Sequence, residues 1–252
     1  MSGMKIAILG ATGGCALSCL DQALNSEDVA SIKCLVRTPP KLASLLEKRT
    51  ISPEVIQTKL QISKEMPSQL KMSKSALKPL ISLSPPSVHS STNKSNLRTS
   101  HDSNRNNTIL ETKMSDRTLC ADAMCALRSA AKELPPSSRP RRLVVISTTG
   151  IDSRRDVPIL FLPMYHYLLQ MPHVDKKVME KLIHERQGDV FPETIILRPS
   201  LLTDGSRTEG KVRVGEKVIG YTISREDTGI VTFNLCGKEG DNFVGKAICA
   251  SY

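Results

Sequence analysis

The first fifty residues alternate between apolar runs and amphipathic stretches. Residues 4–9 are a largely apolar run typical of a buried parallel strand, and Ser31–Val36 is a second such run. Between them, Cys15 to about Leu24 places its apolar side chains at helical spacing. A further helix opens at Pro39, since proline is tolerated in a first turn. The order strand, helix, strand, helix predicts an α/β fold with a doubly wound, Rossmann-type parallel sheet.

The second half of the chain continues this alternation of elements. A helix is also expected after Ser224, which is placed to cap it, with Glu226 and Asp227 in its first turn. The other expected elements are helices over Leu119–Leu134, Pro158–Met171 and Val174–His184, strands over Arg142–Ser147, Thr194–Leu197 and Phe243–Cys249, and a strand near Val212. We therefore expect one Rossmann-like domain spanning residues 1–252.

Residues 64–118 fit neither the strand period nor the helix period. Twelve serines lie between positions 63 and 103, among scattered Lys, Asn and Pro residues. Such a composition is typical of disordered segments. The segment stands where a doubly wound domain has its third and fourth strands. We expect an aberrant, irregular segment at about 64–118 to replace those strands.

Two explanations of this segment stay open. An ordinary low-complexity loop is one. The other, which we favour, is out-of-frame translation, because reading the codons two nucleotides later permits Gly-Asp-Ala at residues 64–67 and Asp-Leu-Ile-Val-Ser-Ala-Ile-Gly at residues 80–88. These stretches resemble the ends of the third and fourth strands of a Rossmann domain. A frameshifted gene model would also predict an inactive chain.

The net charge of +10 raises the question of a nucleic-acid partner. Residues 57–118 contain ten Lys/Arg and four Asp/Glu, so the remainder of the chain carries only +4. Every Phe and Tyr lies at or beyond Phe161, which leaves the basic segment without an aromatic stacking platform. We expect a small-molecule substrate and no nucleic-acid partner. No membrane partner is expected, since no run of about eighteen apolar residues occurs.

The seven cysteines form no CxxC pair and no Cys/His ligand spacing. Together with a start that lacks a secretory signal, this pattern indicates reduced thiols in the cytoplasm and no metal site. The oligomeric state is left open by the sequence.

The glycine-rich turn after the first strand is the first candidate site. Gly10, Thr12, Gly13 and Gly14 are expected to bind a cofactor, because glycines let backbone N–H groups approach a pyrophosphate and the following helix adds a favourable partial charge. Ala16 stands at the third-glycine position, where a small side chain permits close packing of helix and strand.

Arg37 ends the second strand, where an NAD-selective site carries Asp or Glu for the ribose 2′-hydroxyl. A guanidinium binds a 2′-phosphate through paired, charge-assisted hydrogen bonds. Lys41, one turn further on, adds a second cation. The pattern therefore predicts NADP(H) as the cofactor, although a solvated arginine at a strand end is the plain alternative.

The motifs together resemble those of an atypical short-chain dehydrogenase/reductase of the NmrA-like group, within the NAD(P)-binding Rossmann family. The chain is similar also to the small flavin/biliverdin reductases. The residues that carry the resemblance are Gly10–Gly14, Val36–Pro39, Leu143–Gly150, Lys176 with Glu180, and Leu197–Pro199. These motifs are specific to the superfamily and to no substrate.

The resemblance implies that Ser147, Thr148 and Thr149 face the nicotinamide end of the cofactor, and that Pro199 and Ser200 border its pocket. The Tyr-x-x-x-Lys motif of short-chain dehydrogenases is absent, because Leu169 and Met171 stand four places after the two nearby tyrosines. Lys176, or its neighbour Lys177, supplies the lysine instead. Candidate proton donors are Tyr165, His166 and His173.

Two functions follow from this reading. One is an NADPH-dependent reductase of a small carbonyl, enone or flavin-like acceptor, with Lys176, Ser147 and Tyr165 as catalytic residues. The other is a non-catalytic NADP(H) sensor, which the missing Tyr-x-x-x-Lys motif favours.

Overall fold

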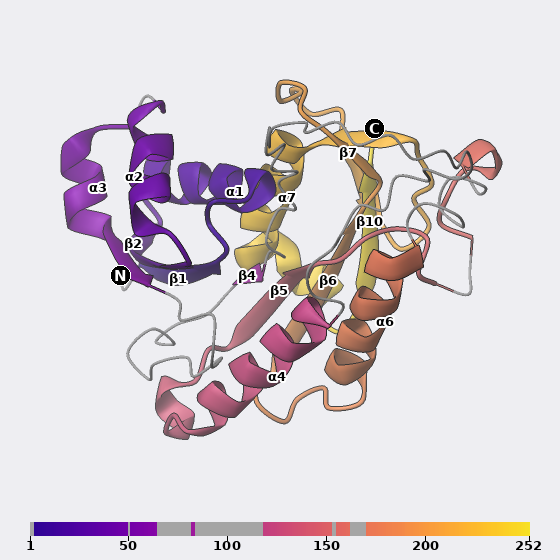
Figure 1. Ribbon diagram of the computed structural model, residues 1–252, viewed down its shortest axis with the longest axis horizontal. Helices are drawn as coiled ribbons and strands as arrows, with labels where there is room; N and C mark the ends of the chain where they lie inside the picture. The colour runs from indigo at the N-terminus through magenta and orange to yellow at the C-terminus, as the bar shows by residue number, and fades with distance from the viewer. Residues whose placement is uncertain (1–2, 50, 65–81, 84–117, 153–154, 162–169) are drawn as a thin grey trace, which may run out of the picture.

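A computed structural model of the chain describes residues 3–49, 51–64, 82–83, 118–152, 155–161 and 170–252 (Figure 1). The main sheet has eight strands in the order β3-β2-β1-β4-β5-β6-β10-β8, and all neighbours are parallel except β10 and β8. The strands are β1 (Met4–Leu9), β2 (Val29–Val36), β3 (Leu60–Lys64), β4 (Ser82–Leu83), β5 (Arg142–Ile146), β6 (Glu193–Pro199), β8 (Arg213–Gly215) and β10 (Ala247–Ser251). A second, two-stranded sheet pairs β7 (Leu201–Thr203) with β9 (Thr222–Ser224). The predicted doubly wound fold is confirmed.

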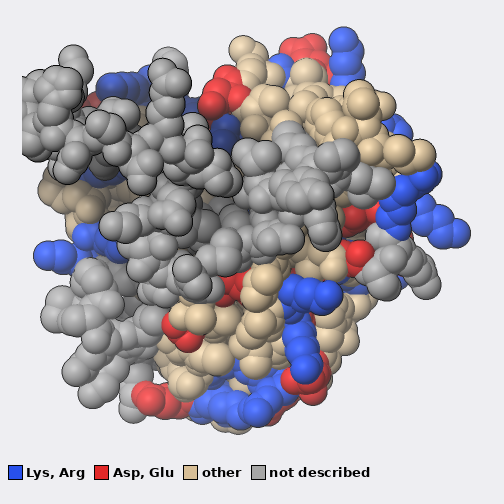
Figure 2. Space-filling view, turned by 45° about the vertical axis from the view of Figure 1, so that its right-hand side comes forward, with Lys and Arg blue, Asp and Glu red and all other residues tan. Residues whose placement is uncertain are grey.

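Helices cover both faces of the main sheet (Figure 1). One face packs against α1 (Gly14–Asn25), α2 (Pro39–Glu47), α3 (Pro53–Lys59) and α7 (Arg225–Cys236), and the other against α4 (Leu119–Lys132) and α6 (Gln170–His184). Short 3-10 turns lie at η1 (Pro136–Ser138), η2 (Ile159–Phe161) and η3 (Lys238–Phe243). Among the described residues, no helix is both long and apolar enough to cross a membrane. On the face in Figure 2, described Lys and Arg side chains lie among Asp and Glu.

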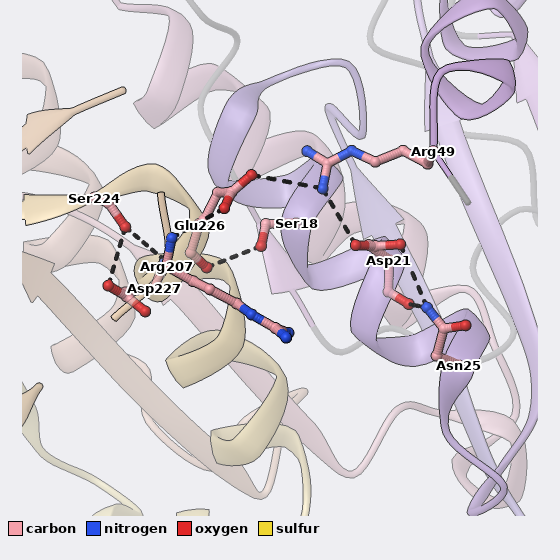
Figure 3. Close-up of polar contacts among 8 residues, drawn as sticks. All are labelled: Ser18, Asp21, Asn25, Arg49, Arg207, Ser224, Glu226 and Asp227. Carbon is pink, nitrogen blue, oxygen red and sulfur yellow. Dashed lines mark hydrogen bonds and ion pairs between the residues drawn. The ribbon is translucent and has the colours of Figure 1, made fainter. Parts of the chain in front are cut away.

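The closest helix pair joins the two ends of the chain. Gly229 of α7 lies against α1 so tightly that a Cβ there would come within 2.4 Å of the Ser18 Cβ and 2.6 Å of the Cys15 carbonyl oxygen. Only glycine permits this approach. The Ser18 hydroxyl donates a hydrogen bond to the Glu226 carbonyl at 2.8 Å (Figure 3). Helix α7 therefore fixes the position of α1, two hundred residues earlier in the chain.

A charged cluster on the surface reinforces this seam. Arg49, just beyond α2, lies 3.2 Å from the Asp21 carboxylate of α1 and 3.8 Å from the Glu226 carboxylate of α7 (Figure 3). The guanidinium thus bridges two helices that already pack through their backbones. Ion pairs near the protein surface add little stability individually.

Strands occupy both positions that the sequence analysis assigned to an irregular replacement. β3 pairs with β2 and ends at Lys64, just as the serine-rich segment begins, and β4 pairs with both β1 and β5 inside that segment. The third strand therefore precedes the segment rather than being replaced by it, and the fourth is a two-residue strand within it. β3 escaped prediction because it is a five-residue edge strand that follows α3 directly, with mixed burial and no apolar run. The rest of residues 64–118 lies almost wholly outside the described residues.

Two other expectations are corrected at their boundaries. The helix expected over Pro158–Met171 begins as the 3-10 turn η2, and residues 162–169 lie outside the described part. The last strand starts at Ala247 rather than Phe243, because η3 runs to Phe243 and Gly245 adopts a left-handed turn with φ +79. By contrast, the predicted cap of α7 is confirmed, since the Ser224 hydroxyl accepts a hydrogen bond from the Asp227 N–H.

Candidate cofactor site

The predicted site residues come from segments that end at one edge of the sheet. The turn after β1, the end of β2, the end of β5 and the end of β6 all lie at the carboxyl ends of parallel strands. The order of the sheet reverses at β1 and β4, and in such sheets ligands bind outside the carboxyl ends of strands at this switch point. The topology therefore gathers these candidates at the expected place.

The turn between β1 and α1 is built for close approach of a ligand. Gly10 has φ +69, a conformation that favours glycine, and its carbonyl accepts a hydrogen bond from the Gly13 N–H at 2.8 Å. Helix α1 begins at Gly14 with Gly13 as its N-cap, without a side-chain cap and without an acidic residue in its first turn. The partial positive charge of the helix N-terminus is thus available to an anion.

Arg37 and Lys41 flank this turn from the second strand and its helix. The Gly10 N–H donates to the Leu35 carbonyl at 3.0 Å, which ties the turn to β2 two residues before Arg37. Arg37 and Lys41 are both exposed. Thr12 is half-buried at the top of the turn. These positions suit a ligand that lies along the edge from β1 to β2.

The end of β5 runs beside β6 toward the other half of the site. The Ser147 N–H donates to the Leu197 carbonyl at 2.7 Å, and the Thr149 N–H donates to the Pro199 carbonyl at 3.2 Å. Ser147 is 1% exposed, and its hydroxyl makes no hydrogen bond to any residue that the structure describes. Thr148 is half-buried between these two anchored residues. A buried hydroxyl without a partner is costly, and this one is available to hydrogen-bond a bound molecule.

Lys176 reaches the same point from α6. Its Nζ donates a hydrogen bond to the Ser147 carbonyl at 2.9 Å. Burial lowers the pKa of Lys176, and the nearby Cys120, Cys15, Glu180 and Asp175 oppose that shift. The structure therefore brings together Lys176 and Ser147, which are separated by 29 positions in the sequence.

Neighbours on either side of Lys176 hold its helix in place. The Asp175 carboxylate accepts hydrogen bonds from the N–H groups of Cys120 and Ala121, at 2.8 and 3.0 Å, and so caps α4. The Glu180 carboxylate binds Arg198 of β6 through two hydrogen bonds of 3.1 and 2.5 Å. Glu180 and Arg198, both singled out by the family resemblance, are thus partners in a buried ion pair that joins α6 to the sheet.

Cys15 shows how near the two halves of the site lie. Burial raises the pKa of its thiol to about 11, while the positive charges of Arg225 and Lys176 act in the opposite direction. The second residue of α1 is therefore within electrostatic range of both α6 and α7. Arg225 was missed in the sequence analysis, since only the fold brings α7 to the glycine turn.

The candidate proton donors have different outcomes. Tyr165 and His166 lie outside the described residues. His173 lies on α6, where burial, followed by the charge of Lys176, lowers its pKa to about 4. Both causes disfavour the cationic form of the imidazole. Within the described part of the chain, no group of three or more His, Cys, Asp or Glu side chains could hold a metal ion.

These features fit a dinucleotide. The glycine turn and the uncapped helix α1 suit a pyrophosphate, and the buried Ser147 hydroxyl offers a hydrogen bond to a ligand at the end of β5. Arg37 and Lys41 supply exposed cations at the β2 end. The residues present thus agree with a nicotinamide cofactor extended along this edge.

Comparisons with known proteins point the same way. Reductase pytE of Aspergillus terreus is 35% identical over 269 residues, covering 98% of this chain and 97% of that protein, and Oxidase pynE of Aspergillus niger is 33% identical over 258 residues, covering 91% of each. A short-chain dehydrogenase/reductase from Veillonella parvula, solved in complex with NADP, shares the fold with a TM-score of 0.63 at 15% identity, over 100% of this chain and 95% of that one. The family model described as NAD(P)H-binding matches residues 10–238. The chain belongs to this NAD(P)H-binding family, as its glycine turn and strand order indicated.

Proposed function

We propose that this protein is an NADP(H)-dependent reductase of a small carbonyl, enone or flavin-like acceptor. The observation that carries the proposal is the 2.9 Å hydrogen bond from Lys176 Nζ to the Ser147 carbonyl, beside a buried Ser147 hydroxyl that has no partner among the described residues. One relative is named a reductase and the other an oxidase. These names support redox chemistry in general and do not fix the direction of hydride transfer.

Each part of the edge has its own task in this proposal. The Gly10, Thr12, Gly13 and Gly14 turn holds the pyrophosphate, Arg37 and Lys41 bind the 2′-phosphate, and the nicotinamide is bordered by Thr148 and Pro199. When bound, the cofactor supplies the hydride.

Reduction of a carbonyl also needs a proton at the oxygen. The Ser147 hydroxyl donates a hydrogen bond to that oxygen, and the Lys176 ammonium stabilises the negative charge that develops there. Tyr165 stays the proposed proton donor. Because burial lowers the pKa of Lys176, its ammonium form is lost at a lower pH than for an exposed lysine.

Cofactor choice tests the first part of the proposal. Wild-type protein and the variant Arg37→Asp are titrated with NADPH and NADH in a fluorescence or calorimetric assay. The aspartate repels the 2′-phosphate and binds the 2′-hydroxyl, so NADPH affinity should fall about tenfold or more while NADH affinity is kept or improved. Lys48→Asp, an exposed change at the end of α2, is the matched control. Equal losses in both variants would show that general charge, not Arg37, sets the preference.

A non-catalytic NADP(H) sensor is the second candidate, favoured by the absence of Tyr-x-x-x-Lys. A panel of carbonyl, enone and flavin acceptors distinguishes the two functions. The reductase oxidises NADPH with at least one acceptor class. Tight binding without turnover on all of them would support the sensor.

We place this activity in the cytoplasm, which the seven free cysteines support. A third candidate is an inactive chain, which an out-of-frame origin of residues 64–118 would produce. Sequencing the transcript tests it, because an uninterrupted message in the printed frame would contradict it.

A further inference from the structure

Arg225 lies across the first residue of α1. A Cβ at Gly14 would stand 2.5 Å from the Arg225 Cδ, and 3.3 and 3.4 Å from its Cβ and Cγ. The stem of the arginine thus occupies the space that any larger residue at position 14 would need. Gly14 permits this contact directly at the N-terminus of α1.

The electrostatic setting of this arginine favours an anion. Arg225 is the first residue of α7 and lies against the first residue of α1, so the positive ends of two helices meet at its side chain. A cation is unfavourable at a helix N-terminus. Its position therefore calls for a negative partner.

The partner seen in the structure is a weak one. Arg225 Nη1 lies 2.5 Å from the Asp204 carboxylate, but the Asp204 side chain is 89% exposed. Exposed ion pairs contribute little net free energy and are easily exchanged. The pair can therefore open for an anion of higher charge.

The other acidic residues near Arg225 are engaged elsewhere. The Glu226 carboxylate accepts from the Arg207 N–H at 3.1 Å and lies near Arg49 (Figure 3). The Asp227 carboxylate accepts hydrogen bonds from Ser224 and from Tyr252, at 3.1 and 2.6 Å. Of the contacts recorded among the described residues, only Asp204 gives Arg225 an ion pair.

We infer that Arg225 helps to position the cofactor. Its guanidinium separates from Asp204 and binds the pyrophosphate of the nicotinamide cofactor across the start of α1. This inference rests on the proposed function. The pyrophosphate is its ligand, rather than the 2′-phosphate, because Arg225 lies on Gly14 at the helix N-terminus, whereas Arg37 and Lys41 belong to β2 and α2. A guanidinium makes paired hydrogen bonds to phosphate oxygens that a lysine cannot reproduce.

Three ligands separate the contribution of each arginine. NADPH and 2′-phospho-ADP-ribose contain the pyrophosphate, and 2′-AMP carries the 2′-phosphate without it. Arg225→Gln should weaken binding of the first two ligands about tenfold or more and change binding of 2′-AMP less than about twofold. Arg37→Gln should weaken binding of all three ligands.

Asp204→Asn removes the competing carboxylate and should tighten NADPH binding by about two- to fivefold. Lys238→Gln, an exposed change in η3, is the control for lost charge.

Gly14→Ala tests the contact itself. The added methyl group displaces the Arg225 stem, so it should weaken NADPH binding in the wild-type background and add little in an Arg225→Gln background. Thermal unfolding of each variant identifies any that has lost its fold. If Arg225→Gln has lost its fold, Arg225→Lys replaces it, because lysine keeps the charge without the paired N–H groups of the guanidinium.

The outcomes separate the two levels of the argument. Unchanged NADPH affinity in Arg225→Gln, alongside weaker binding in Arg37→Gln, overturns this inference and leaves the proposed function intact. Equal weakening of 2′-AMP and NADPH in Arg225→Gln also overturns it, because the arginine would then act without the pyrophosphate. Failure of the wild-type protein to bind NADPH or 2′-phospho-ADP-ribose contradicts both proposals.

Discussion

The two ends of the candidate site differ in how the chain builds them. The end at β1 and β2 uses residues 10–14, Arg37 and Lys41, which lie within about thirty positions of one another. The end at β5 and β6 combines Ser147, Lys176 and Pro199, from two strands and a helix on the opposite face. Local sequence specifies the first end, whereas tertiary packing assembles the second.

This difference teaches which parts tolerate change. The conformation of the glycine turn depends on its own residues, so the turn forms wherever β1 and α1 form. The Lys176–Ser147 contact depends on the placement of α6, which in turn depends on Asp175 and Glu180. Changes at the assembled end should therefore affect chemistry, and changes at the local end should affect cofactor binding.

Replacement of Lys176 by Met is the strongest way to test the assembled end. The ammonium that acts beside the reacting oxygen is lost, so turnover with NADPH should fall about a hundredfold or more, with a smaller change in NADPH affinity. Steady-state kinetics and a binding titration measure the two effects. Lys177→Met is the matched control, because its exposed neighbouring side chain should alter neither.

The pH profile refines this test. Because burial lowers the pKa of Lys176, activity should decline as the pH rises at values below 10.5, and Lys176→Arg should move that decline to higher pH. Loss of turnover in Lys177→Met, or an unmoved profile in Lys176→Arg, would contradict the role of Lys176.

Gly229→Ala tests the seam that connects the two ends. The new methyl group would lie 2.4 Å from Ser18 and 2.6 Å from the Cys15 carbonyl, so α1 and α7 must separate. We expect the free energy of unfolding to fall by about 2 kcal/mol, even though alanine favours a helix. Chemical denaturation measures it. Gly205→Ala, where the nearest atom would be 3.8 Å away, is the control and should change the stability by less than about 0.5 kcal/mol. If the free energy of unfolding of Gly229→Ala equalled that of the wild type, α1 and α7 would pack less tightly than these distances indicate.

The smallest expected effect belongs to the loop after β5. Asp156 is 8% exposed, its Oδ1 accepts from the Gly150 N–H at 2.9 Å, and its Oδ2 has no hydrogen bond among the described residues. Burial raises its pKa above the ordinary 3.8, so the ionised carboxylate destabilises the fold at neutral pH and protonation relieves this cost in acid. Asp156→Asn should therefore be more stable than wild type at pH 7, by up to about 1 kcal/mol.

Thermal melts from pH 7 down to pH 3.5 measure that difference. The advantage of Asp156→Asn should shrink as the pH falls through the raised pKa, and it should vanish below 3.8. A wild-type protein that is the more stable at pH 7 would contradict this account.

The sequence predicted those elements that carry their own local signal. The apolar runs of β1 and β5, the glycine turn and the Ser224 cap all depend on neighbouring residues, and each lies where it was expected. β3 was missed because an edge strand buries little and shows no apolar run. Arg225 was missed because its role depends on the packing of α7 against α1, which no local pattern records.

The pairing of α1 with α7 has a consequence during synthesis. The first helix leaves the ribosome early, but the surface that covers it, including Gly229, is translated some two hundred residues later. Until then the face of α1 that packs against α7 has no native cover, and the nascent chain must be kept from aggregating over that interval. Folding of this family member is thus tied to completion of nearly the whole polypeptide.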